Sequence, residues 1–392
     1  MLNPYLETRM FEFPLRPLLI EVDPNVGLYR LQGVLTSMGI ALRPAIPTFN
    51  MIGLLPVPAK LIEVINALPG VTAVHADLQS NALVEMPFAP NHELWHTTSE
   101  SRNVLEAGEA FKAGWTGETV RLFVIDTGID PMHPQLEGAE WESAISIPRE
   151  AGLDVGPTSS GHGSHVASTA AGKLHFADVG FFVEGVSRAR IHSIQALGRV
   201  IGTGFTSEIV DAMGRALEKG AKVVNMSLGS KECQGGCDAC PQCRAVRRLT
   251  ENGVLVAIAA GNSGPDANTI GCPGCSPYAI TVGAIDREGQ VASFSSRGGP
   301  KFPTKPDVVA PGVDIFSGTG RATQVDGGDP QAGFGYAAIS GTSMATPHVA
   351  GFLALLAHRN PEFTTDQFKQ TVRAGGAFNP STGWGVPKWS MF

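Results

Sequence analysis

The chain has 392 residues, of which 43% are apolar and 17% charged, so it can bury a large core and lacks the composition of a disordered protein. Its 47 glycines and 28 prolines follow no fixed period, which excludes a fibrous repeat. The net charge of −7 comes without a long basic run, and this argues against nucleic acid as a partner. At this length two folded units are the natural expectation.

The N-terminal segment, MLNPYLETRMFEFPLRP, has no uninterrupted apolar core behind a basic start, so it lacks the pattern of a secretory signal. No apolar run in the sequence reaches the roughly 18 residues that crossing a bilayer requires. We therefore expect a soluble, cytoplasmic protein with no membrane partner, while a start codon further upstream would leave secretion open. Thiols in the cytoplasm are normally reduced.

The first 91 residues alternate strand-like and helix-like segments. Helices are expected at residues 28–38 and 59–68, where apolar residues recur on one helical face. Strands are expected at residues 17–22, 41–46, 50–57 and 71–76. The resulting order, β-α-β-β-α-β, is that of a small ferredoxin-like α+β domain.

A polar, proline-containing stretch, residues 79–102, is predicted to be a linker. We accordingly assign residues 1–92 to the small domain with its linker and residues 93–392 to a second domain. From residue 118 onward, strongly apolar strands are expected at residues 120–125, 191–196, 222–226, 254–259 and 279–282, with helices between them. This alternation predicts an α/β fold, a parallel sheet covered on both faces with its active site at the carboxyl ends of the strands.

Three short segments stand where that architecture places a site. Asp126 follows a predicted strand in VIDTGID, His162 lies between glycines in GHGSHVASTAAG, and Ser343 opens a predicted helix, residues 344–357, in GTSMATPHVAG. Each alone has an ordinary interpretation: an acidic residue that opens a turn, a structural histidine, or a serine that caps a helix. The neighbouring His165 is predicted to be structural.

Together, in the order Asp, His, Ser, these segments resemble those of the subtilisin family of serine peptidases, also called subtilases or peptidase family S8. The resemblance runs from about residue 117 to residue 387 and includes the motifs VVNMSLG, VAIAAGNSG, ITVGAID and KPDVVAPG. It implies a serine endopeptidase that acts on proteins or peptides, with a subtilisin-like parallel sheet sandwiched by helices.

The resemblance also implies a role for each motif residue. Ser343 attacks the peptide carbonyl, His162 takes and returns the proton, and Asp126 fixes the imidazole tautomer. Asn262, in the GNSG turn, is expected to donate its side-chain amide to the oxyanion. The expected substrate-binding residues are Ser227, Leu228 and Gly229, which pair with extended substrate, Ala259, Ala260 and Gly261, which wall the specificity pocket, and Gly271 at its floor.

Residues 1 to about 92 resemble the propeptides of this family, which assist folding and inhibit the enzyme until they are removed. We expect an autoprocessed zymogen cleaved between Leu83 and Ser101, and the alternative is a plain accessory domain. In many relatives the stretch after the catalytic-histidine helix carries an asparagine-containing calcium loop. Residues 173–187, KLHFADVGFFVEGVS, lack that pattern, so no calcium site is expected.

Six cysteines fall in two groups: Cys233, Cys237, Cys240 and Cys243 in KECQGGCDACPQC, and Cys272 and Cys275 in GCPGCSP. The resemblance to subtilisins implies that both groups border the expected pocket. Clustered Cys-x-x-Cys spacings in a reduced compartment favour metal binding over disulfides. A [4Fe–4S] cluster is the first expectation, zinc the second, and disulfides or free thiols the third. Four ligands suffice for either cofactor, so two cysteines would be spare. The favoured set is Cys237, Cys240 and Cys243 with Cys272 or Cys275.

Such a cluster beside the pocket predicts that its oxidation changes proteolysis, and the alternative is a purely structural staple. Two competing functions are a non-catalytic peptide-binding regulator and a redox sensor whose output is cleavage. The intact set of Asp126, His162, Ser343 and Asn262 argues against the regulator. The sequence makes no prediction of the oligomeric state.

Overall fold

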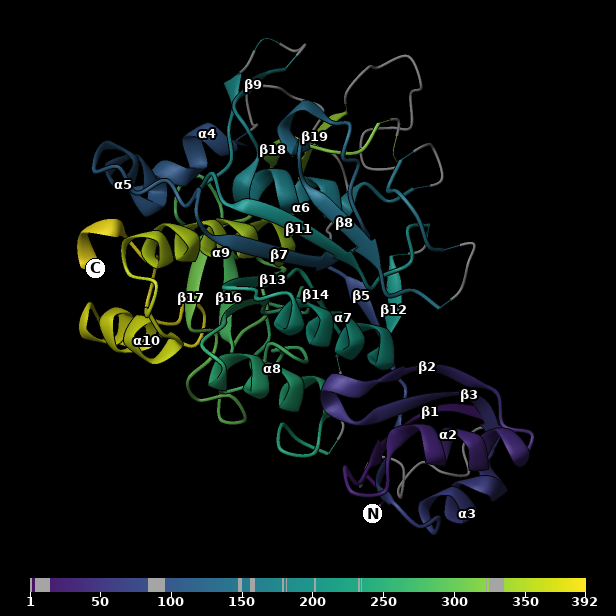
Figure 1. Ribbon diagram of the computed structural model, residues 1–392. Coiled ribbons are helices and arrows are strands. Elements are labelled where there is room, and N and C mark those ends of the chain that lie inside the picture. Colours follow the sequence, from purple (N-terminus) through teal and green to yellow (C-terminus); the bar gives the residue numbers. More distant parts are fainter. Residues whose placement is uncertain are drawn as a thin grey trace.

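The computed structural model describes residues 2–3, 15–83, 96–146, 150–155, 159–177, 180, 182–200, 202–231, 233, 235–321, 323 and 335–392. These residues form a small N-terminal unit, purple in Figure 1, and a large α/β unit beside it. Among the helices of the described residues, none has both the length and the apolar character that a bilayer span requires.

The small unit is an antiparallel four-stranded sheet with helices on one face. In space its strands follow the order β2 (Leu42–Ile46), β3 (Met51–Pro58), β1 (Leu15–Val22) and β4 (Val71–Ala76). Helices α2 (Leu28–Ser37) and α3 (Ile62–Asn66) pack on it, the latter after the short 3-10 helix η2 (Ala59–Leu61). This is the ferredoxin-like topology expected from the sequence.

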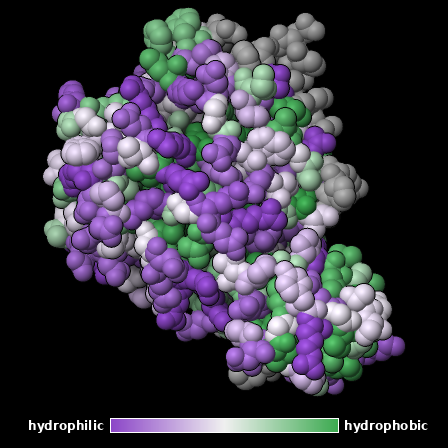
Figure 2. All heavy atoms as spheres, in the orientation of Figure 1, coloured by the Kyte–Doolittle hydropathy of each residue, from purple (hydrophilic) through white to green (hydrophobic). Residues whose placement is uncertain are grey.

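The two faces of the small sheet have different neighbours because side chains alternate along a strand. Leu18 and Ile20 of β1 lie in the apolar cluster shared with α2 and α3. Leu19, between them, lies instead in a buried cluster of the large unit. Apolar residues also gather on the outer surface of the small unit, as Figure 2 shows. The inner face of the small sheet therefore docks on the large unit.

The large unit is built on a seven-stranded parallel sheet. In space its strands follow the order β17 (Val308–Pro311), β16 (Ile280–Ile285), β15 (Leu255–Ala259), β13 (Val223–Met226), β7 (Arg121–Asp126), β11 (Arg190–Gln195) and β8 (Glu140–Ser143). All five predicted strands are present. The two edge strands were not expected. The sequence of β8, EWES, has no apolar run, and β17, VVAP, was noted only as part of the motif KPDVVAPG. The chain order reverses at β7, and sites form at such reversals.

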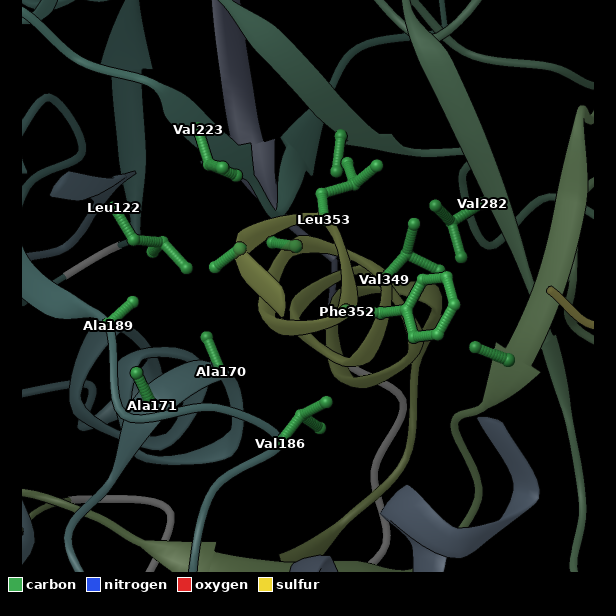
Figure 3. Close-up of a cluster of buried hydrophobic side chains, with 14 of the residues drawn as sticks. Leu122, Ala170, Ala171, Val186, Ala189, Val223, Val282, Val349, Phe352 and Leu353 are labelled. Carbon is green, nitrogen blue, oxygen red and sulfur yellow. The ribbon is translucent and has the colours of Figure 1, made fainter. Parts of the chain in front are cut away.

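Helices cover both faces of this sheet, which confirms the predicted α/β fold. Helices α6 (His162–Ala171) and α9 (Thr342–Arg359) lie on one face, and α7 (Thr206–Glu218) and α8 (Pro241–Glu251) lie on the other. Figure 3 shows Val349, Phe352 and Leu353 of α9 surrounded by apolar side chains of the strands and of α6. This packing holds the middle of α9 against the sheet and α6.

The predicted linker at residues 79–102 is wrong where the structure describes it. Residues 79–82 form a strand, β5 (Gln79–Ala82), and residues 96–101 form β6 (His96–Thr97) and α4 (Thr98–Ser101). Strand β5 lies between β12 (Thr203–Phe205) and β14 (Leu228–Gly229). Its sequence, QSNA, shows no apolar pattern because the pairing is made by the main chain. Residues 84–95, with the expected boundary at residue 92 and most of the expected cleavage interval, lie outside the described residues.

Candidate active site

Asp126 and His162 form a buried hydrogen-bonded pair. Asp126 is the last residue of β7, and His162 is the first residue of α6. Their atoms Oδ1 and Nδ1 are 2.6 Å apart, and both side chains have no exposed surface. Gly161, before the histidine, has φ of 77°, a conformation that favours glycine and lets the helix begin at the imidazole. Thr127 N donates a further hydrogen bond to Asp126 Oδ1, at 2.7 Å.

Ser343 lies in the first turn of α9, one residue after the helix begins at Thr342, so Gly341 is the cap. Its Oγ donates to Ser227 O at 2.9 Å, and Ser227 Oγ donates to Ser343 O at 2.8 Å. His162 Nε2 is buried and has no hydrogen-bond partner among the described residues. No hydrogen bond therefore joins Ser343 Oγ to His162 Nε2 among the described residues.

Only the carbonyl oxygen of the Asn262 side-chain amide is hydrogen-bonded among the described residues. Its Oδ1 accepts hydrogen bonds from Thr342 N at 3.0 Å and from Thr342 Oγ1 at 2.8 Å. Its Nδ2 is buried and has no partner among the described residues. A buried donor without a partner is costly, so its retention beside Ser343 fits a group that waits for an oxyanion.

A strand of the protein itself occupies the cleft in front of these residues. In β5, Ala82 pairs with Leu228 and Asn81 with Gly229, so the segment predicted to bind substrate does pair with extended chain. On the other edge of β5 lies β12, which the sequence analysis did not single out. Directly after β5, Leu83 N donates to Ser343 Oγ at 3.2 Å.

A cavity of about 440 Å³ adjoins Leu83. The predicted pocket residues Gly229, Gly261 and Gly271 line it together with Asn262. The predicted Ala259 and Ala260 are not among the lining residues, although Ala260 O accepts a hydrogen bond from Gly271 N at 2.8 Å. Besides residues 81–83, the sequence analysis missed seven further lining residues: Ser230, Lys231, Ser263, Asn268, Thr269, Ile270 and Lys301. A second cavity, of about 500 Å³, contains none of the predicted site residues.

Asp154 is a further residue that the sequence analysis missed. Its Oδ2 accepts from Thr127 Oγ1 at 2.8 Å and its Oδ1 from Gly161 N at 2.9 Å, so it joins the turns that carry Asp126 and His162. Burial raises the pKa of Asp154 to about 7. No motif marks it, because its partners come from two other segments.

His165 is placed as a structural residue. Its Nε2 lies 2.9 Å from Ile315 O and 3.2 Å from Ala337 O, and burial lowers its pKa to about 3. The imidazole is therefore neutral at physiological pH and bonds strands β18 (Ile315–Gly318) and β19 (Tyr336–Ile339).

All six cysteines converge beside the pocket. Two sets of four have all their sulfurs within 4.8 Å of one another: Cys233, Cys240, Cys243 and Cys272, and Cys233, Cys237, Cys243 and Cys275. None of the six forms a disulfide. Ser230 and Cys272 exchange backbone hydrogen bonds of 2.8 and 2.9 Å, so the cluster is joined directly to the pocket wall. The described cysteines can hold a metal.

Comparisons with known proteins agree with this geometry. Residues 117–385 match the subtilase family, peptidase S8. The chain is 31% identical over 341 residues to serine protease AprX of Bacillus subtilis, across 81% of this chain and 72% of AprX. It is 33% identical over 324 residues to subtilisin J of Geobacillus stearothermophilus, across 79% of this chain and 76% of that protein.

A solved structure shows a similar fold. It is that of fervidolysin from Fervidobacterium pennivorans, a keratinolytic enzyme related to subtilisin. The TM-score is 0.74 at 22% identity, and the likeness covers 96% of this chain and 60% of fervidolysin.

Proposed function

Since this chain belongs to the subtilase family and is a serine endopeptidase of the subtilisin type, we propose that Ser343 is its nucleophile and that it is made as a zymogen that cleaves itself. The observation that carries the proposal is β5, a strand of the same chain that ends against Ser343.

The proposed reaction uses the contacts of the site. His162 Nε2 takes the proton of Ser343 Oγ as the oxygen attacks the peptide carbonyl, and Asp126 stabilises the imidazolium. Asn262 Nδ2 and the Ser343 N–H donate to the oxyanion of the tetrahedral intermediate. The intermediate collapses to an acyl-enzyme as the imidazolium gives its proton to the leaving amine. Water, activated by the same imidazole, then releases the acid and restores Ser343.

The position of Leu83 supports cleavage between Leu83 and Val84. Leu83 Cδ1 lies 3.4 Å from the place where a Cβ on Gly229 would stand, so its side chain reaches the pocket wall. A Cβ placed on Gly341 would lie 2.4 Å from Leu83 O and 3.4 Å from Asn262 Nδ2. The carbonyl oxygen of Leu83 and the proposed oxyanion donor, Asn262 Nδ2, therefore both lie beside Gly341. The other half of the bond belongs to residue 84, which lies outside the described residues.

Buried polar contacts support an inhibitory role for the small unit. Asp77, just before β5, accepts hydrogen bonds from Ser207 N at 2.7 Å and Ser207 Oγ at 2.6 Å, at the start of α7. Arg43 of β2 pairs with Asp77 at 3.4 Å and with Glu208 at 3.0 Å. All four side chains are buried. These contacts hold β5 in the cleft, where it excludes substrate.

The test is to express the chain with and without Ser343→Ala and to follow the intact mass. The unsubstituted chain is expected to yield an 83-residue fragment and a chain that begins at Val84, whereas Ser343→Ala stays at full length. The matched control is Ser390→Ala at an exposed serine, which should process normally. An unsubstituted, folded chain that stays intact would contradict the zymogen. A new N-terminus elsewhere would contradict only the cleavage position.

We also propose that the cysteines hold a metal or an iron–sulfur cluster that regulates the protease by shaping the pocket. The support is the pair of backbone hydrogen bonds between Cys272 and Ser230, which lines the pocket. The test is to compare peptide cleavage before and after oxidation of the cysteines. Unchanged cleavage by a chain whose thiols have been oxidised would leave only a structural role.

A further inference from the structure

The two sets of four cysteines share two members. Cys233 and Cys243 belong to both sets, and their sulfurs are 3.7 Å apart. Each set is completed by two cysteines of its own: Cys240 with Cys272, 3.4 Å apart, and Cys237 with Cys275, 3.3 Å apart. The six sulfurs therefore outline two tetrahedra that share an edge.

The spacings fit metal ions better than the other possibilities. Around a tetrahedral ion with metal–sulfur bonds of about 2.3 Å, neighbouring sulfurs stand about 3.8 Å apart. The sulfurs of Cys243 lie 3.9 Å from Cys272 and 3.8 Å from Cys275, so both tetrahedra approach that edge length. A disulfide needs about 2.05 Å. In a four-iron cluster each cysteine binds a different iron, so its thiolates stand farther apart than the edges of one tetrahedron.

We propose that the six cysteines bind two zinc ions as one binuclear thiolate cluster. Cys233 and Cys243 bridge the ions, Cys240 and Cys272 complete one, and Cys237 and Cys275 complete the other. Binding converts six thiols to thiolates and releases six protons, and two divalent ions leave the cluster with two negative charges. No cysteine is spare. The proposal rests on the metal site of the proposed function and specifies its composition.

The surroundings suit such an anionic cluster. Cys240 caps the N-terminus of α8 and Cys243 lies in its first turn, where the helix dipole favours negative charge. Four of the cysteines are buried, among apolar neighbours that include Ala260 and Ile270. Burial of unpaired thiolates is costly, so coordination is what stabilises them there.

Each ion connects the two cysteine segments. The pairs Cys240–Cys272 and Cys237–Cys275 both take one ligand from residues 233–243 and one from residues 272–275. The first segment follows pocket residues Gly229–Lys231, and the second follows Asn268–Gly271. The cluster thus cross-links the two segments that follow two walls of the pocket.

The test uses the Ser343→Ala chain, purified under reducing conditions and loaded with Zn²⁺, so that its outcome does not depend on proteolysis. Elemental analysis is expected to give two zinc ions per chain and no acid-labile sulfide. After exchange with ¹¹³Cd²⁺, the NMR spectrum should show two resonances of all-thiolate cadmium that are coupled to each other through the shared sulfurs. Coupling requires bridging thiolates, and this measurement needs no substitution in the cluster.

Variants of the cluster test the assignment of each ligand. Cys240→Ser should lower the stoichiometry from two ions to one, and Cys237→Ser should do the same for the other ion. Cys243→Ser should lower the affinity of both, so that a chelator removes both ions together. One zinc per chain, uncoupled cadmium signals, bound iron with sulfide, or a mass loss that indicates disulfides would each overturn the binuclear cluster. The first three of these results would leave the metal site of the proposed function in place with a different composition.

Discussion

The residues proposed as catalytic and the cysteines lie at the same rim of the sheet, but different interactions fix them. Asp126 ends a strand, His162 begins a helix, and Ser343 sits in the first turn of a helix buried along most of its length. The cysteines lie mostly in irregular turns, and only Cys243 is inside a helix. Packing of regular elements therefore fixes the backbone positions of Asp126, His162 and Ser343. The pocket behind it depends on cross-links between loops, which in our proposal are metal ions.

The largest expected effect is on kcat and comes from a substitution in the proposed triad itself. Asp126→Asn keeps the shape of the side chain but favours the wrong imidazole tautomer, so kcat on a peptide substrate should fall about 10⁴-fold, a loss known for triads of this kind. The folded structure should be retained, as circular dichroism would show. A loss smaller than tenfold would mean that Asp126 does not position the general base.

The next effect tests how the buried carboxyl group of Asp154, which joins the turns of Asp126 and His162, changes stability with pH. The pKa of Asp154 is about 7 in the folded protein and near 3.8 when unfolded, so the folded state holds one proton more between these pH values. This contribution to stability is complete below pH 4 and is lost as the pH rises through 7. In the Ser343→Ala background, Asp154→Asn should therefore flatten the pH dependence of the free energy of unfolding by about 4 kcal/mol.

Urea titrations at several pH values measure this difference. Asp266→Asn, at an exposed position, is the control and should leave the pH dependence unchanged. Parallel curves for Asp154→Asn and its parent would show that Asp154 is not the buried acid described above.

A smaller effect tests the oxyanion donor. Asn262→Ala removes the free Nδ2 and should lower kcat by about 10²–10³-fold with little change in KM, the range known for this donor in subtilisin. The comparison variant is Thr342→Val, which removes the hydroxyl bonded to Asn262 Oδ1 but leaves Nδ2 in place. It should cost much less. Equal losses in both variants would assign the effect to local packing.

The smallest effect belongs to the cysteine cluster. Removal of metal from the processed enzyme by a chelator should raise KM about tenfold for peptides with leucine before the cleaved bond, while kcat changes less than threefold, because a loosened pocket weakens binding in ground and transition states alike. Added Zn²⁺ should restore KM. An equal fall in kcat would show that the cluster supports the triad as well.

The sequence was most informative where chemistry demands fixed residue types. The segments around Asp126, His162 and Ser343 carry their glycines and small residues because close packing at the rim requires them, so motifs reveal them. Five of the strands were also clear, since a sheet covered on both faces favours apolar residues in its strands, but the short apolar strand β17 was missed. The edge strand β8 escaped because it is short and polar.

Other parts of the site depend on contacts that no local pattern encodes. Strand β5 was taken for a linker because its partners, β12 and β14, lie more than a hundred residues away. Asp154 has no signature because its partners, Thr127 and Gly161, belong to two other segments and no motif joins the three. The cysteine spacings indicated a metal site, but only the folded chain shows which sulfurs belong to both sets.

The position of β5 between two strands also bears on which proteins the enzyme can digest. A polypeptide that enters the cleft in this way must offer both edges of its backbone over several consecutive residues. In helices and interior strands the backbone N–H and C=O groups are already hydrogen-bonded within the target protein. Proteolysis by this cleft thus depends on how often a target locally unfolds, and a tightly folded protein is spared even when its sequence is acceptable.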